Sequence, residues 1–257
     1  MDKSQQLLDI YRKNPCRTLP NAYWKSAADL EDAELLLNRD QDGDLLAFGL
    51  WKESGLMAYW CARIGSNLLE QDQIEHVPFA LVHEQCLPLF DERNFSLRQA
   101  YFRLKHSGKP QPDCPEGFVF KTVDPQVDLP AVVSLIRSCY RNINVDQEIV
   151  TQWLRHPVYD PELWVWICDQ AQNKPVGLGI AELDQQVPEA SLEWVQVLPS
   201  YHKRGLGTAI VSELLARVDG KAAFTTVSGE VNNRSKPELL YRKCGFTGDD
   251  VWWLLRS

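Results

Sequence analysis

The residue types that could carry out chemistry gather in one short segment, Val195–Ala209 (VQVLPSYHKRGLGTA). A strand-like run ends at Pro199, and a loop with two glycines then leads into an apolar helix pattern. A strand-to-helix junction of this kind directs several free backbone N–H groups, and the positive end of the helix dipole, at one point. A pyrophosphate suits such a point. The residues that favour this ligand are Gly205, Gly207, Thr208, Lys203 and Arg204.

A G-x-G sequence alone does not identify a nucleotide site, because an ordinary strand-to-helix turn also uses glycine for its backbone conformation. A dinucleotide-binding Rossmann turn is disfavoured, since GLGTAI lacks the third glycine of GxGxxG and antiparallel strand patterns precede the loop. The Walker pattern is absent as well. The choice between an ordinary turn and a phosphate-binding turn therefore depends on further motifs.

Together with its neighbours, this loop resembles the acyl-CoA signature of the GNAT acetyltransferases, (R/Q)-x-x-G-x-(G/A). The segment His202–Gly207 reads HKRGLG, and a V-x-P-x-Y pattern precedes it as in many members of the family. A second landmark of the family, LYxKxGF in a short late helix, is matched by Leu240–Phe246 (LYRKCGF). One helix and one strand separate the two motifs, as expected. The resemblance covers roughly residues 116–257.

Two positions depart from the family pattern. His202 stands where the family usually has Arg or Gln, and Lys236 replaces the second Asn of a common NxxNPxxLY variant. The first position acts mainly through its backbone N–H in the family, so the resemblance implies weakened rather than abolished CoA binding. The histidine itself is not interpreted as catalytic. The second departure puts a CoA contact from the side chain at position 236 in doubt.

The resemblance implies that acetyl-CoA, as acyl donor, lies along the strand and loop described above. Its pantetheine arm would bond to the backbone of Val195 and Val197, where two strands of such folds splay apart. The phosphates would lie against the loop and the first turn of the helix. The further cofactor-binding candidates are His202, Lys203, Arg204, Gly205, Leu206, Gly207, Thr208 and Asn233.

Direct attack by an amine requires a base that removes a proton, and the departing thiolate gains from a proton donor. Tyr241 stands where the thiolate acid of the family usually stands, although it could instead be a packing residue of an amphipathic helix. Glu193 is the candidate base, acting directly or through water, and Ser191 shares its face by strand alternation. A solvated carboxylate is the competing interpretation. Glu182 and Glu230 are weaker alternatives.

Two other residue types suggest chemistry less strongly. Cys244 lies beside the proposed acid, but no histidine neighbours it in sequence, so direct transfer without an acyl-enzyme is favoured. Several tryptophans could line an acceptor pocket for a hydrophobic or aromatic amine, although core packing is the more common role of this residue. They are Trp164, Trp166, Trp194, Trp252 and Trp253.

The elements that must position these residues follow a boundary at Ser107–Gly117, where three prolines and two glycines disfavour regular structure. After it, alternating apolar patterns predict strands at Phe118–Val123, Leu163–Cys168, Val176–Glu182, Ser191–Leu198, Ala222–Val227 and Val251–Leu255. Helical spacing predicts helices that begin at Asp128, Asp146, Gly205 and Pro237.

Before the boundary, Asp44–Trp51 and Leu56–Ile64 predict a hairpin, and residues 79–104 look partly helical with an interruption at Pro88. We therefore expect two domains, residues 1–115 and 116–257. The first is interpreted, as a hypothesis, as a degenerate copy of the GNAT fold.

Composition limits the class of protein. The chain has 257 residues, of which 44% are apolar and 24% charged, and its net charge of −8 disfavours nucleic acid and anionic membranes as partners. An acidic surface could help to collect a cationic amine, although solubility also explains it. Seven scattered cysteines form no CxxC and no zinc-type spacing, so they predict reduced thiols and no metal site. No signal or membrane-spanning segment is evident, which predicts a cytoplasmic protein.

The sequence thus predicts an α+β GNAT fold, with a mixed and mostly antiparallel sheet flanked by helices, and an additional N-terminal α/β domain. The expected activity is acetyl transfer from acetyl-CoA to a primary amine of a small molecule or peptide. The alternatives are a non-catalytic acyl-CoA-binding module and an acyltransferase that uses a longer acyl group. A homodimer is compatible with the sequence, which does not identify the acceptor.

Overall fold

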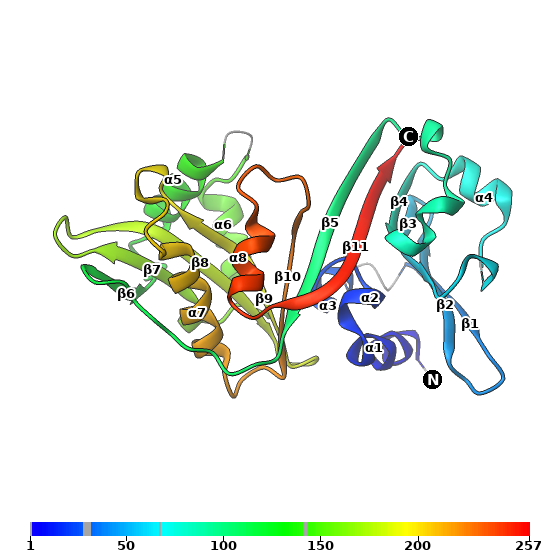
Figure 1. Cartoon of the computed structure of the whole chain (residues 1–257), viewed down its shortest axis with the longest axis horizontal. Helices are drawn as coiled ribbons and strands as arrows, with labels where there is room; N and C mark the ends of the chain where they lie inside the picture. Colours follow the sequence, from blue (N-terminus) through cyan, green and yellow to red (C-terminus); the bar gives the residue numbers. More distant parts are fainter. Residues whose placement is uncertain (1, 28–31, 67, 141–142) are drawn as a thin grey trace. The chain divides into compact units, whose positions relative to one another are not determined.

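The computed structural model describes residues 2–27, 32–66, 68–140 and 143–257, and the chain divides into two compact units (Figure 1). The first unit comprises residues 1–105, 227–238 and 247–257. The second unit comprises residues 106–226 and 239–246. Each unit is described by itself below.

The first unit begins with three helices, α1 (Lys3–Lys13), α2 (Pro15–Thr18) and α3 (Tyr23–Ala27). An antiparallel meander follows, formed by β1 (Glu34–Arg39), β2 (Leu45–Lys52) and β3 (Gly55–Cys61). After α4 (Gln71–His76), the chain returns as β4 (Phe79–His83), which pairs in parallel with β3. Short 3-10 turns lie at Ile64–Ser66, Glu84–Leu89 and Glu92–Asn94.

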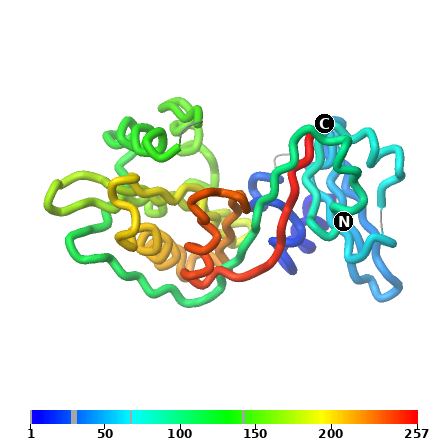
Figure 2. The backbone as a smooth tube through the Cα atoms, turned by 45° about the horizontal axis from the view of Figure 1, so that its top comes forward, coloured from blue at the N-terminus to red at the C-terminus, as the bar shows by residue number. Residues whose placement is uncertain are grey.

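Two long strands complete the first unit, β5 (Leu97–His106) and β11 (Thr247–Arg256). β11 pairs antiparallel with β4 on one side and with β5 on the other, although it comes about 140 residues later in the chain than β5. Figure 2 shows β11 (red) running beside β5 (green). The core of this unit includes Leu56, Tyr59, Ala80, Val82, Phe90 and Leu255.

The second unit is built on a meander of β6 (Phe118–Thr122), β7 (Trp164–Asp169), β8 (Lys174–Asp184) and β9 (Glu189–Val197). Helices α5 (Leu129–Cys139) and α6 (Gln147–Arg155) and the 3-10 turn Pro161–Leu163 lie between β6 and β7 in the chain. After β9, the 3-10 turn Pro199–Tyr201 leads to α7 (Leu206–Val218). β10 (Phe224–Glu230) begins in this unit and α8 (Pro237–Lys243) ends in it.

The two faces of this sheet are covered differently. One face packs against α5 and α6 through a core that includes Val132, Ile136, Trp164, Leu178 and Ile180. On the other face, α7 lies close to β8 because two positions of this strand are glycine. A Cβ atom at Gly179 would stand 2.4 Å from Ile210 Cγ2 of α7, and one at Gly177 would stand 3.0 Å from Ile210 Cδ1. The absence of side chains at Gly177 and Gly179 thus lets α7 pack close to β8.

The predicted elements of the second half are present. The predicted strands correspond to β6 to β11, and the predicted helices to α5, α6, α7 and α8. The predicted hairpin corresponds to β2 and β3. The expectation of helix within residues 79–104 is wrong, since this segment forms β4, two 3-10 turns and most of β5, with Pro88 inside the first turn. No helix in the described part of the chain is long and apolar enough to cross a membrane.

The two units do not follow the predicted boundary between residues 115 and 116. Residues 107–117 form neither helix nor strand, as expected, but the units interleave on either side of them. The physical reason is the pairing of β11 with β4 and β5, which assigns residues 247–256 to the first unit. A boundary inferred from loop composition cannot show such long-range pairing.

Candidate functional site

The loop between β9 and α7 has the backbone of an anion-binding turn. Lys203 and Gly205 both have positive φ, +63° and +79°, and Gly205 is the N-cap of α7. The N–H of Ala209 donates to the Gly205 carbonyl at 3.0 Å, which is the first bond of the helix. The amides of Leu206 and the next two residues therefore precede the first intrahelical bond and remain directed out of the helix end. A Cβ atom at Gly205 would find only Pro115 within 4 Å, so this backbone is accessible.

Side chains hold the loop against the strands. The His202 ring lies 2.9 Å, through Nε2, from the carbonyl oxygen of Val197 at the end of β9. Tyr201 donates its hydroxyl to Asp169 Oδ2 at 2.9 Å, and this bond lowers the pKa of the Asp169 carboxyl below its usual value. The Arg204 guanidinium lies 4.8 Å from the centre of the Tyr201 ring. The His202 ring thus holds the loop against the end of β9, and the Tyr201 hydroxyl holds it against Asp169 of β7. The Arg204 side chain packs on the Tyr201 ring.

β9 contains a β-bulge at Glu193. Trp194 is paired with Ile180 of β8 and Leu192 with Ala181, so Glu193 is an extra residue without an opposite partner in the ladder. A bulge changes the direction of the side chains that follow it. The carboxylate of Glu193 accepts a hydrogen bond from Ser191 Oγ at 2.8 Å, which confirms that these two side chains share a face.

The same register shows which way the backbone of Val195 and Val197 points. Leu198 N–H donates to Val176 O, so the pair Leu198–Val176 is a hydrogen-bonded pair of the antiparallel ladder. Hydrogen-bonded and non-hydrogen-bonded pairs alternate, so Val197 and Val195 occupy non-hydrogen-bonded positions opposite β8. Their N–H and C=O groups therefore point away from β8. The Val197 carbonyl is already engaged by the His202 ring, and the groups of Val195 face the side of β9 on which β10 is its neighbour in the sheet.

Tyr241 is buried on α8 and lies within electrostatic reach of Glu193. Its pKa is raised well above the usual value for tyrosine, chiefly because burial removes the phenolate from water, and also because Tyr140, Cys244 and Glu193 are nearby. A phenol in this environment keeps its proton at neutral pH. The structure thus brings the two catalytic candidates into one neighbourhood.

α8 is fixed beside the start of α7. A Cβ atom at Gly207 would lie 3.3 Å from Leu240 Cδ2, and the Cys244 Sγ lies 4.0 Å from the Thr208 carbonyl. Gly245 has φ +89° and ends α8, and Phe246 N–H donates to the Tyr241 carbonyl. Burial raises the pKa of the Cys244 thiol, so the reactive thiolate form is disfavoured.

Two candidates are not part of the second unit. Asn233 and Glu230 belong to the first unit, and Asn233 Oδ1 accepts bonds from Ser235 N and Oγ at 2.9 and 2.7 Å. The proposed CoA contact of Asn233 therefore stays a prediction. Glu182 is buried on β8, opposite Ser191 in the ladder.

The tryptophans named above divide into core residues and one residue near the candidate site. Trp164 and Trp252 are fully buried, and Trp166 is 4% exposed, so these three are core residues of their own units. Trp253 is partly buried and packs against the core of the first unit. Trp194 is partly exposed and directly follows Glu193; it stacks on Trp153 with ring centres 5.4 Å apart. Tyr140 contacts the edge of Trp194 at 5.8 Å.

Sequence reasoning missed three residues of this neighbourhood. Tyr140 and Trp153 contribute to the aromatic surface described above, and they carried no signal beyond an apolar helix face. Gln196 on β9 is 5% exposed, and neither atom of its side-chain amide has a hydrogen-bond partner among the residues that the structure describes. A buried amide of this kind is a candidate for contact with a ligand. In the described ranges, no group of three or more His, Cys, Asp or Glu residues could hold a metal ion.

The segment that carries this loop and α8 is similar in sequence to known acetyltransferases. Residues 161–248 match the family model of the acetyltransferase (GNAT) domain. A curated relative from Bacillus subtilis, the uncharacterized N-acetyltransferase CgeE, is 31% identical over 88 residues, which is 32% of this chain and 34% of the relative. The match thus spans about a third of the length of that relative.

Solved structures show the same fold over both units. A GCN5-related N-acetyltransferase from Sphaerobacter thermophilus superposes with a TM-score of 0.65 at 18% identity, over 92% of this chain and 85% of the other. A GNAT-family acetyltransferase from Colwellia psychrerythraea gives 0.63 at 14% identity, over 100% and 97%. A tandem GNAT protein from the clavulanic acid biosynthesis pathway gives 0.55 at 14% identity, over 99% and 94%. The fold of both units is thus shared with these solved structures.

Proposed function

On the premise that this chain carries a GNAT acetyltransferase domain, we propose that it transfers an acetyl group from acetyl-CoA to a primary amine of a small molecule or peptide. The family and fold support acyl transfer in general. The acetyl donor and the amine acceptor are the specific parts of the proposal. The observation that carries it is the loop from His202 to Gly205, whose two positive-φ residues and accessible helix start suit a pyrophosphate.

The residues present fit acetyl-CoA. The amides of Leu206, Gly207 and Thr208 are free of intrahelical partners, and Lys203 adds a positive charge beside them. Gly205 leaves room for phosphate oxygens to approach the backbone. An extended pantetheine arm would bond to the N–H and C=O groups of Val195, which point away from β8. When bound, acetyl-CoA supplies the activated acetyl thioester.

Two side chains then move protons. Glu193 accepts a proton from the attacking amine, directly or through water, so that the nitrogen lone pair can form the new C–N bond. Tyr241, which is protonated at neutral pH, donates its phenolic proton to the departing thiolate sulfur as the C–S bond breaks. The amine loses one hydrogen and the thiol gains one, which balances the reaction. Ser191 positions the Glu193 carboxylate through its hydroxyl.

The test is a thiol-release assay with acetyl-CoA across polyamines, amino acids, aminoglycosides and peptides, repeated with Tyr241→Phe. Loss of a general acid typically costs about 10²- to 10⁴-fold in rate. We therefore expect kcat to fall by about that factor while the Kd for CoA is unchanged. Tyr159→Phe is the matched control, because the Tyr159 hydroxyl is buried without a partner among the described residues and its removal should change neither quantity.

The outcomes separate the alternatives. CoA binding without thiol release for any acceptor would favour a non-catalytic binding module, and faster release from longer thioesters would favour a different acyl donor. Equal turnover of Tyr241→Phe and Tyr159→Phe would remove Tyr241 from the mechanism. Absence of any heat on titration with CoA would overturn the proposal as a whole.

A further inference from the structure

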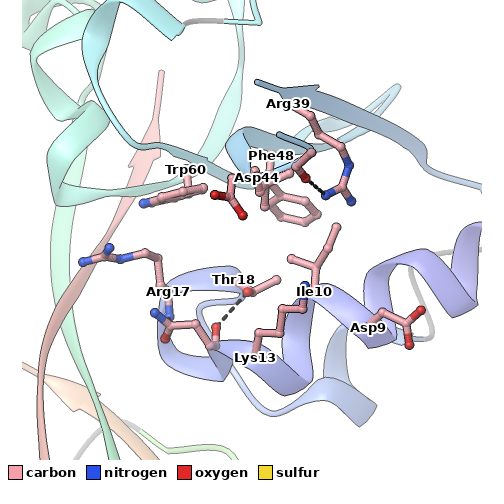
Figure 3. Close-up of a pocket in the computed structure, with 12 residues that line it drawn as sticks. Asp9, Ile10, Lys13, Arg17, Thr18, Arg39, Asp44, Phe48 and Trp60 are labelled. Atoms are coloured by element: carbon pink, nitrogen blue, oxygen red, sulfur yellow. Dashed lines mark hydrogen bonds between the residues drawn. The ribbon is translucent and has the colours of Figure 1, made fainter. Parts of the chain in front are cut away.

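A cavity of about 240 Å³ lies within the first unit, between helices α1 and α2 on one side and strands β2 and β3 with the β1–β2 turn on the other (Figure 3). All of its lining residues belong to residues 9–60 of that unit. Its apolar lining includes Phe48, Trp60 and Ile10, which are 0%, 7% and 8% exposed. The proposed acyl transfer uses none of these residues.

Two opposite charges face this cavity from its two sides. Lys13 comes from the last turn of α1, and its ammonium points up toward Phe48 (Figure 3). Asp44 follows the β1–β2 turn, and its carboxylate points down from the strand side. Within the described ranges, neither side chain makes an ion pair or a hydrogen bond with another residue. A ligand could therefore engage both groups.

The other cations of the rim already have partners. Arg17 lies 3.5 Å, through Nε, from Asp250 Oδ1, and its guanidinium lies over the Trp60 ring at 5.8 Å. Arg39 donates from Nη1 to the Gly43 carbonyl at 2.9 Å, and Figure 3 shows this bond. Asp9 also lines the cavity, and its Oδ1 accepts a hydrogen bond from Gln5 Nε2 at 2.8 Å. Lys13 and Asp44 are thus the charged pair that remains for a ligand.

We propose that this cavity binds a free α-amino acid with an apolar or aromatic side chain. The carboxylate of the amino acid pairs with Lys13, its ammonium pairs with Asp44, and its side chain packs against Trp60 and Ile10. Each charge of the site repels a ligand that carries only that sign, which selects a zwitterion over a simple anion or cation. The volume is below the 300–1,000 Å³ typical of drug-sized ligands, so a nucleotide cofactor does not fit.

The ligand-side test uses the full-length chain without acyl-CoA, so its result does not depend on the proposed transferase activity. L-leucine and L-phenylalanine are titrated by calorimetry, with affinity expected in about the millimolar range for so small a ligand. L-leucinamide lacks the carboxylate and N-acetyl-L-leucine lacks the ammonium. Because each analogue loses one hydrogen-bonded charge pair, each should bind at least about tenfold more weakly than leucine.

The protein-side test asks whether each charge acts on the predicted group. Lys13→Met should remove the preference for leucine over leucinamide, and Asp44→Asn should remove the preference for leucine over N-acetyl-leucine. Asp42→Asn, in the same turn but outside the lining, and Lys109→Met, in an exposed loop, are matched controls and should bind as the wild type does. Should either Lys13→Met or Asp44→Asn retain both preferences, or should the wild type bind no free amino acid, the proposal is overturned.

Discussion

Adding one methyl group at Gly179 should disturb the packing that holds α7 in place. The Cβ atom of Gly179→Ala would stand 2.4 Å from Ile210 Cγ2, 3.0 Å from Leu214 Cδ1 and 3.1 Å from Val165 Cγ2. Ordinary carbon–carbon contacts lie at about 3.5–4.0 Å, so the shortest contact is about 1 Å too close. Because the interior is close-packed, either α7 moves away from β8 or its side chains leave their preferred rotamers.

The size of the effect follows from two opposing contributions. Overpacking a core costs about 1–3 kcal/mol, and the 2.4 Å contact places this case near the upper value. Replacing glycine by alanine also reduces the entropy of the unfolded chain, which stabilises by about 0.4–1 kcal/mol. We therefore expect a net loss of about 2 kcal/mol in the free energy of unfolding. The start of α7 should move with the helix, so CoA binding should weaken as well.

The measurement is urea denaturation of Gly179→Ala, with CoA calorimetry on the folded variant. Gly65→Ala is the control, since a Cβ atom at that glycine would meet nothing within 4 Å. In a double-mutant cycle, Ile210→Ala removes the group that clashes, so the double variant should be more stable than the sum of the two single effects predicts. Wild-type stability of Gly179→Ala, or strict additivity in the cycle, would refute the packing argument.

Three further predictions concern titration and thiols. The Tyr201 hydroxyl lowers the pKa of Asp169, so the ionised Asp169 carboxylate stabilises the folded protein above the unfolded pKa of about 4, and this stabilisation is lost as pH falls through the folded pKa. In thermal melts measured over a pH series, Asp169→Asn should therefore lose less stability at acid pH than the wild type does. Because the pKa of Tyr241 is raised above the usual value of about 10, Tyr241 should stay protonated near pH 10 and turnover should not decline there. If turnover does decline near pH 10, and the Tyr241→Phe variant shows no such decline, the prediction is contradicted. The Sγ atoms of Cys61 and Cys86 lie 2.7 Å apart, so hydrogen peroxide should convert these two thiols into one disulfide with release of two waters; peptide mapping that finds another pairing would contradict this.

The second half of the chain is predictable because its signals are local. α6, for example, has an apolar stripe and a capping residue, Asp146, whose carboxylate accepts a hydrogen bond from the Ile149 amide. Each strand of the meander pairs with its neighbour in sequence, so alternation and turn residues suffice. The loop motif at His202–Gly207 belongs to the same class of local signal.

The errors arise where pairing partners are distant in sequence. β4 is five residues long, and its partners are β3 in parallel and β11, which is far away in the chain. Nothing in residues 79–104 themselves reveals those partners, so mixed periodicity around Pro88 suggests a helix. The same distant pairing makes a composition-based boundary at residue 115 insufficient.

The candidate site shows a similar limit. Alternation correctly places Ser191 and Glu193 on one face, but it cannot show the bulge at Glu193. The register after the bulge leaves Val195 and Val197 in non-hydrogen-bonded positions, so their backbone groups point away from β8. The contact of the His202 ring with the Val197 carbonyl is likewise a matter of loop geometry, which the residue type alone does not indicate.

The position of β11 constrains the order in which the chain can fold. During synthesis, β4 and β5 emerge early, yet the strand that pairs with both of them appears only after residues 106–246 have been made. Until then, each presents an unpaired edge, which is a site for aggregation or for binding a chaperone. The second unit, whose strands pair in order, can form first. We infer that the first unit, most of which is translated before the second, is the last to be completed.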